Sequence, residues 1–272
     1  MGKPQFLRRS LTLLAFGVAM VLFTGCGGDE PFPLESSDVE DIYSGGVGGT
    51  KYFVTSTNPA DFGTITGKVN YTGRRRNRKV PLAKDFCINA NPNGMLSENF
   101  MVGANGELGN VIVYVKFGLK KVSFPTPTES VLLDQKACQY LPHLVVVQFG
   151  QELIIRNSDN HEHNVHWMPG VNGEINEPMN TPFDLDPMTF SRTQVAASVK
   201  CEIHGWMQSY VAVLAHPCWA ITKDDGTFEI KGVPPGNLQL AAWHEELGEI
   251  PIDFTLAKSE SKAQDFTFPV PK

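Results

Sequence analysis

The sequence predicts an all-β protein. Short runs rich in β-branched and aromatic residues recur from residue 63 onward, and such runs usually form strands. Turn signals such as Asn105-Gly106 and Asp225-Gly226 separate them, whereas no segment keeps the apolar spacing of an amphipathic helix. The pattern favours antiparallel sandwiches or barrels with short helices at most. The predicted strands lie at residues 65–71, 111–115, 144–147, 153–155, 210–214 and 228–230.

Composition narrows the class of protein. The chain has 272 residues, of which 42% are apolar and 19% are charged. These values exclude a disordered polyelectrolyte and are sufficient for a hydrophobic core in one or two domains. The formal net charge is −6, and an acidic protein is a poor general partner for nucleic acid. We therefore expect a globular protein that does not bind nucleic acid.

The first 25 residues are typical of an export signal. Lys3, Arg8 and Arg9 precede an apolar run at residues 11–24, which is shorter than the ~20 residues of a membrane-spanning helix. We expect this segment to be removed during export.

Residues 22–27 resemble the lipobox of bacterial lipoproteins, in which the cysteine, here Cys26, is acylated and becomes the new N-terminus. Ordinary secretion with cleavage nearby is the alternative. Residues 26–59 are acidic and contain a glycine-rich stretch, so we expect a flexible tether that carries the lipid anchor. The protein would then sit on the cell envelope membrane and face the periplasm or the exterior.

The strongest chemical signal is a Cys-x-x-His-x-x-Met motif formed by Cys201, His204 and Met207. A strand that ends at Cys201 and a tight loop can bring the three side chains round one ion. A thiolate, two imidazoles and a weakly bound thioether form a ligand set that suits copper. The second imidazole must come from a neighbouring loop, and His163 lies shortly after a predicted strand.

His161 and His166 flank His163 and remain alternatives for this ligand or for groups that contact it from outside. Other chemistries explain the motif less well. A cysteine nucleophile with a histidine base would need an oxyanion site and a third orienting group, neither of which the sequence indicates. Structural zinc disfavours a methionine ligand, and a dinuclear copper centre would need a second cysteine in the loop. We expect one mononuclear copper ion and no catalytic residue.

Residues 144–214 resemble a cupredoxin, and the spacing of the ligand loop is similar to that of amicyanin-like members. The resemblance implies a Greek-key barrel or sandwich with a type 1-like copper ion, and a side chain at Asn164 that braces the cysteine loop. Gly205 departs from the proline of the amicyanin-like loop, which predicts a more mobile loop. The ligands that the resemblance implies are His163, Cys201, His204 and, axially, Met207.

A second resemblance covers the segments on either side. Residues 63–69 and 221–243 resemble a carboxypeptidase regulatory-like, prealbumin-like β-sandwich, with an Asp-Gly hairpin and the turn Pro234-Pro235-Gly236. Because these segments bracket the copper motif, we expect a cupredoxin-like domain packed on, or inserted into, an immunoglobulin- or prealbumin-like sandwich. The expected divisions are a signal peptide at 1–25, a tether at 26–59, the first part of the sandwich at 60–127, the cupredoxin-like domain at 128–215 and the remainder of the sandwich at 216–272.

The remaining cysteines and a basic cluster carry weaker signals. Thiols outside the cytoplasm tend to pair, and we expect a disulfide between Cys87 and Cys138. Cys218 lies in an apolar strand and is typical of a small buried hydrophobe. The basic cluster at residues 74–79 is either a solvated hairpin loop or a surface for an anionic partner or lipid headgroups.

These observations predict a membrane-anchored extracytoplasmic copper protein that transfers single electrons and is not an enzyme. Its expected partner is a redox protein such as a c-type cytochrome. The alternatives are a copper-binding module for storage or delivery, and a non-catalytic β-sandwich surface protein that binds carbohydrate or protein.

Overall fold

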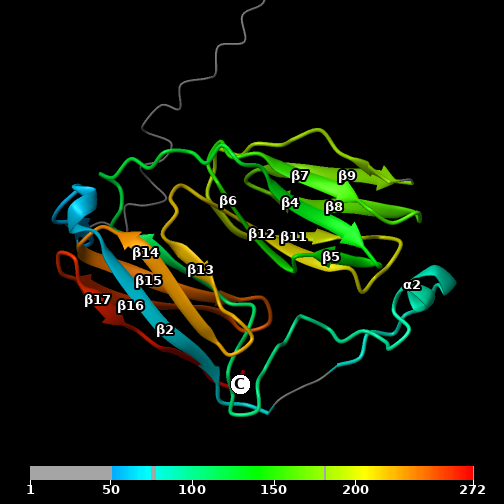
Figure 1. Ribbon diagram of the computed structural model, residues 1–272, viewed down its shortest axis with the longest axis horizontal. Helices are drawn as coiled ribbons and strands as arrows, with labels where there is room; N and C mark the ends of the chain where they lie inside the picture. The colour runs from blue at the N-terminus through cyan, green and yellow to red at the C-terminus, as the bar shows by residue number, and fades with distance from the viewer. Residues whose placement is uncertain (1–50, 75–77, 181, 272) are drawn as a thin grey trace, which may run out of the picture. The chain divides into compact units, whose positions relative to one another are not determined.

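The computed structural model describes residues 51–74, 78–180 and 182–271, so the expected signal peptide, Cys26 and most of the expected tether lie outside the described residues. Strands account for 49% of the structure and helices for 4%, which confirms the all-β prediction (Figure 1). The short helices are η1 (Pro59–Asp61) and α2 (Asp85–Ala90). Within the described residues, no helix has the length and apolarity needed to cross a membrane.

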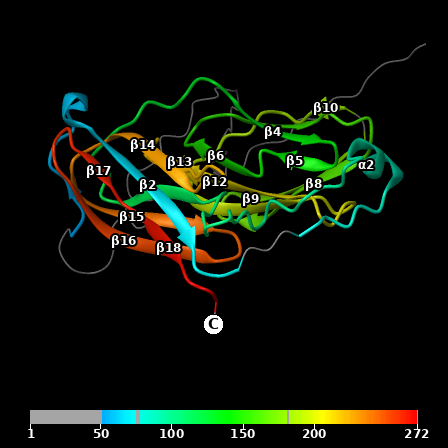
Figure 2. The same ribbon diagram turned by 60° about the horizontal axis from the view of Figure 1, so that its bottom comes forward.

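One β-sandwich is built from strands at both ends of the described chain. In one sheet, β1 and β16 pair with β15, which pairs with β3, which in turn pairs with β13. In the facing sheet, β2 pairs with β14, β17 and β18, and Figure 2 shows β2 in blue beside β17 and β18 in red. The strands are β1 (Phe53–Val54), β2 (Gly63–Tyr71), β3 (Ile112–Phe117), β13 (Trp219–Ile221), β14 (Thr227–Val233), β15 (Gly236–His244), β16 (Gly248–Leu256), β17 (Ser261–Ala263) and β18 (Phe266–Phe268).

The second sandwich is built from the strands between β3 and β13. Its sheets have the orders β10-β7-β4-β5 and β6-β12-β11-β8-β9, and the side chains between them form one hydrophobic cluster. Because β3 pairs directly with β13, the chain leaves the first sandwich and returns to a neighbouring strand. The strands are β4 (Val131–Lys136), β5 (Gln139–Leu141), β6 (Leu144–Gln148), β7 (Leu153–Asn157), β8 (His163–Gly170), β9 (Gly173–Met179), β10 (Phe183–Asp184), β11 (Gln194–Lys200) and β12 (Gln208–Leu214).

Several central strands are buried on both faces, which explains their continuous apolar sequences. In β3, Val113 and Val115 pack in the core of the first sandwich. Ile112 and Tyr114 point to the opposite face, as strand alternation requires, and join a separate cluster with side chains of β6 and β12. The two sandwiches therefore share an apolar contact as well as the chain connection.

The strand pairing differs from the antiparallel expectation. The pairs β6–β12, β4–β7, β2–β17 and β2–β18 are parallel. A local run of apolar residues identifies a strand but carries no information about the direction of its neighbour. β12, the strand that follows the candidate ligand loop, lies between β6 and β11 in its sheet.

Candidate metal centre

The Cys-x-x-His-x-x-Met motif forms a tight loop between two adjacent strands. β11 ends at Lys200, immediately before Cys201, and β12 begins immediately after Met207. Two backbone hydrogen bonds close the loop: Met207 N donates to His204 O at 2.8 Å, and Cys201 N donates to Met207 O at 3.1 Å. The loop conformation is thus determined by its own backbone and by the pairing of β11 with β12.

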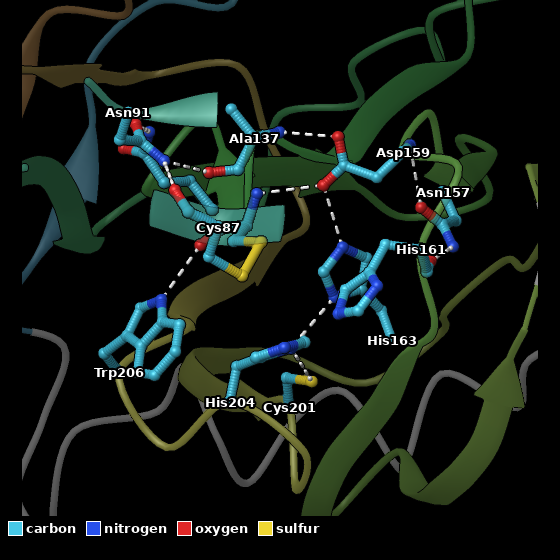
Figure 3. Close-up of a disulfide and its surroundings, with 12 residues drawn as sticks. Cys87, Asn91, Ala137, Asn157, Asp159, His161, His163, Cys201, His204 and Trp206 are labelled. Carbon is cyan, nitrogen blue, oxygen red and sulfur yellow. Dashed lines mark hydrogen bonds and ion pairs between the residues drawn. A yellow bond between two sulfur atoms is a disulfide. The ribbon is translucent and has the colours of Figure 1, made fainter. Parts of the chain in front are cut away.

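Three candidate ligand atoms converge at this loop (Figure 3). His163 Nδ1 lies 3.1 Å from His204 Nδ1, and Cys201 Sγ lies 3.6 Å from the same nitrogen. One donor atom from each residue lies within 4.8 Å of the other two, and all three residues are buried. An ion about 2 Å from each of two nitrogens keeps them roughly 3–3.5 Å apart. The donor set therefore fits a single metal ion.

The three histidines of the HEHNVH segment lie in different surroundings. His163 is the first residue of β8 and is fully buried. His166, three residues further along the strand, contacts Glu202 through Nδ1 at 2.5 Å and Glu174 through Nε2 at 3.0 Å. An odd spacing along a strand places two side chains on opposite faces. The structure therefore brings His163, and not His166, to the candidate ligands.

The surroundings of Cys201 lower the pKa of its thiol relative to an ordinary cysteine. Burial raises the pKa of the Cys201 thiol, but the hydrogen bond with His163 and nearby backbone N–H groups outweigh burial and leave this pKa below its ordinary value. Burial lowers the pKa of His163, while Asp159 and Cys201 outweigh it, so the net shift is upward. Burial and the charge of His163 lower the pKa of His204 to about 4. Cys201 is accordingly suited to bind a metal as an anion.

Asp159 orients His163 and was not recognised in the sequence. Its Oδ2 lies 2.8 Å from His163 Nε2 and accepts a hydrogen bond from Cys138 N at 2.9 Å, while Oδ1 accepts from Ala137 N at 2.7 Å. The contact leaves Nδ1 of His163 facing His204. An acidic residue four positions before a candidate ligand is the sequence signal that could have identified it. Carboxylates that contact the second ring nitrogen of a metal ligand fix its orientation.

Asn164 braces the ligand loop. Its Oδ1 accepts a hydrogen bond from Glu202 N at 3.1 Å, and its Nδ2 donates to Asn176 Oδ1 at 2.8 Å. The Tyr140 hydroxyl donates to Asn164 O at 2.8 Å. These contacts connect the residue after Cys201 to β8 and β9, so the loop is held from its outer side.

A cap covers the outer edge of His204. Helix α2 is joined to the turn between β4 and β5 by a disulfide between Cys87 and Cys138. Phe86 of this helix stacks on the His161 ring at a centroid distance of 4.7 Å, and the His161 ring lies 5.3 Å from that of His204. Trp206 lies 5.2 Å from the His204 ring and donates from Nε1 to Cys138 O. We call Phe86, Cys87, Cys138 and Trp206 the cap. Its helix comes from the segment between β2 and β3, and the cap explains why His204 is fully buried.

The structure places the remaining predicted residues as follows. Met207 is buried in the same core as Cys201. Cys218 is buried in the core of the first sandwich, where burial raises the pKa of its thiol to about 12. Residues 75–77 of the basic cluster lie outside the described residues, and Arg78 contacts Glu246 through Nη1 at 3.3 Å.

The chain is similar in fold to parts of several solved structures. No protein-family model matches the chain, and no curated protein matches it. An amicyanin in the Cu(I) state is 22% identical, with a TM-score of 0.29 over 31% of this chain and 81% of that chain. An oxidised amicyanin mutant is also 22% identical, with a TM-score of 0.28 over 34% of this chain and 88% of that chain. A copper-containing nitrite reductase from Thermus scotoductus SA-01 is 13% identical, with a TM-score of 0.29 over 34% of this chain and 24% of that chain. These scores are too low to support a function, which must be argued from the residues of the site.

Proposed function

We propose that the chain binds one copper ion through Cys201, His163 and His204 and transfers single electrons. The observation that carries this proposal is the buried convergence of one sulfur and two Nδ1 atoms, separated by 3.6 and 3.1 Å. Met207 would supply a fourth, weakly bound thioether ligand, because it is buried and closes the same loop. When bound, the copper ion supplies a centre that alternates between Cu(II) and Cu(I).

The surroundings of these ligands support an electron carrier and not an enzyme. Asp159 holds the His163 ring, Asn164 holds the loop after Cys201, and backbone hydrogen bonds hold the loop itself. Ligands fixed by such contacts move little between two oxidation states, and their burial keeps bulk water away. Both features favour electron exchange over binding of a substrate.

Electrons would reach the surface near the cap. His204 is fully buried, whereas the neighbouring Trp206 and His161 are each partly exposed. Their rings lie 5.2 and 5.3 Å from the His204 ring. We propose that a redox protein such as a c-type cytochrome docks against this edge. The lipobox-like sequence at Cys26 supports an anchor at the envelope membrane, although it lies outside the described residues.

Copper storage or delivery is the second candidate, and the ligand loop itself favours it. Gly205 is exposed, and a Cβ built on it would meet nothing within 4 Å, so packing does not restrain this part of the loop. Stopped-flow measurements separate the two functions. Rapid electron exchange with a small redox protein supports the carrier, and rapid loss of copper to a chelator supports delivery.

Copper titration of a Cys201→Ser variant tests the site. The wild-type protein should bind one equivalent of Cu(II) and show an intense thiolate-to-copper absorption band, with a matching EPR signal. The substitution should abolish the band because the sulfur ligand is lost. Cys218→Ser is the matched control, since it removes another buried free cysteine from the other sandwich and should retain the band. A wild-type protein without the band, or a band that survives in Cys201→Ser, would overturn the proposal.

A further inference from the structure

A second group of metal-ligand atoms lies under the cap and shares His204 with the first group. Cys87 Sγ and one ring nitrogen each from His161 and His204 lie within 4.8 Å of one another. Figure 3 shows the Cys87–Cys138 disulfide, His161 and His163 on one side of the His204 ring and Cys201 on the other. The Nδ1 atom of His204 faces His163 and Cys201, so its Nε2 remains for this second group.

The two histidines of this group have unused nitrogens. Nε2 of His161 and Nε2 of His204 are buried and have no hydrogen-bond partner among the described residues. His204 is fully buried, so water cannot easily satisfy it from the surface. Buried polar atoms are normally paired, and those that are not call for an explanation. Two unpartnered imidazole nitrogens beside a sulfur atom form a ligand set for copper or zinc.

The disulfide prevents this set from binding an ion. A sulfur atom in a disulfide is a poor ligand compared with a thiolate. The partner cysteine lies in a different environment, because Cys138 Sγ lies within 4.8 Å of a ligand atom of Asp159 and of His163. Oδ1 of Asp159 already accepts a hydrogen bond from Ala137 N, and its Oδ2 accepts one from Cys138 N and contacts His163 Nε2. Only the Cys87 side therefore has ring nitrogens without a hydrogen-bond partner among the described residues.

We propose that reduction of the Cys87–Cys138 disulfide opens a second metal site, formed by Cys87, His161 and Nε2 of His204, that binds Cu(I). A dithiol reductant would donate two electrons and two protons, converting the disulfide to two thiols while it is oxidised to its own disulfide. Binding of Cu(I) then releases the proton of the Cys87 thiol. With the first site filled through Nδ1, Nε2 of His204 would have to pass its proton to solvent before it could hold the second ion. This step rests on the proposed function, because it uses His204 of the first site.

The two single cysteine variants make a matched test. Cys138→Ser and Cys87→Ser remove the same disulfide and should lose similar stability, but only Cys138→Ser keeps the Cys87 thiol. Each variant is titrated anaerobically with Cu(I) in ascorbate, which does not reduce disulfides efficiently. The number of copper equivalents bound per protein is then measured by elemental mass spectrometry. We expect two equivalents for Cys138→Ser and one each for Cys87→Ser and the oxidised wild type. Adding His161→Gln to Cys138→Ser should return the count to one.

The outcomes distinguish failure of this inference from failure of the proposed function. One equivalent in Cys138→Ser, or two in Cys87→Ser, would overturn the second site. If instead the first site were wrong, the oxidised wild type would bind no copper, while Cys138→Ser would bind one equivalent that His161→Gln removes. If neither cysteine variant folds, wild type treated with a phosphine reductant and then desalted gives the same count. Two equivalents that fall to one with His161→Gln support the site, and an unchanged single equivalent refutes it.

Discussion

At the residue scale, the candidate centre depends on a carboxylate that binds no metal. Asp159 contacts His163 on one side and the backbone of the Ala137–Cys138 turn on the other. Both turn residues have positive φ, at 51° and 57°, a conformation that costs energy for residues with a side chain and needs support from neighbours. The same carboxylate thus supports the turn at the disulfide and orients a proposed ligand.

Asp159→Asn tests this positioning role. The amide has one acceptor oxygen in place of two, so it cannot keep all the contacts with His163 and the turn. Loss of such an outer contact typically weakens metal affinity by about 10–100-fold, and we expect a decrease of that order in competition with a copper chelator. Asp184→Asn, at an exposed ion pair with Arg156, should leave affinity unchanged. Equal affinity in Asp159→Asn and wild type would contradict the role.

At the element scale, the loop between β11 and β12 is short and hydrogen-bonded to itself, and one of its residues has free space around it. The backbone bonds between Cys201, His204 and Met207 restrain the ligands. Gly205, by contrast, is exposed and has space around its Cα. The loop therefore holds its ligand residues in place, and the fold does not require the backbone freedom of a glycine at position 205.

Gly205→Ala should stabilise the protein. Where the native conformation accepts a Cβ, alanine lowers the entropy of the unfolded chain and adds about 0.4–1 kcal/mol to the free energy of unfolding. We expect this gain in urea unfolding, together with slower loss of copper to a chelator. Gly226→Ala is the opposite control, because Gly226 has φ +75° and its Cβ would lie 2.5 Å from Val69 O. A loss of stability in Gly205→Ala would show that the loop requires glycine.

At the scale of the whole molecule, one apolar cluster joins the two sandwiches, and two buried histidines contribute to the free energy of unfolding. Side chains of β3 and β15 pack with those of β6 and β12. His216 and His244 are buried, and burial lowers the pKa of each to about 4. Burial therefore holds these imidazoles in the neutral form in the folded protein.

Stability should fall as the solution becomes acidic. An unfolded histidine titrates near pH ~6.5, whereas His216 and His244 stay neutral in the folded chain until about pH 4. Between these values the unfolded state binds more protons, so this contribution is complete above pH ~6.5 and decreases as pH falls. We expect a lower urea midpoint at pH 5 than at pH 7.5.

His244→Gln isolates this effect from other titrating groups. His163 and His166 have raised pKa values and act in the opposite sense, so the comparison is the pH-dependent difference between variant and wild type. The variant should show a smaller fall in midpoint between pH 7.5 and pH 5. An unchanged fall would show that His244 does not contribute.

The sequence by itself determined the all-β class, most of the central strands and the loop that carries Cys201 and His204, because each depends on a local pattern or a short spacing. Only the tertiary structure decided which histidine joins them. His161, His163 and His166 are close in sequence, and their separation depends on where β8 begins and which face it buries. The parallel partner of β6, the contact of Asp159 with His163 and the cap from α2 were also decided there. The strand pairing and the cap join segments that are far apart in the sequence, and the contact of Asp159 with His163 depends on how the chain turns between β7 and β8.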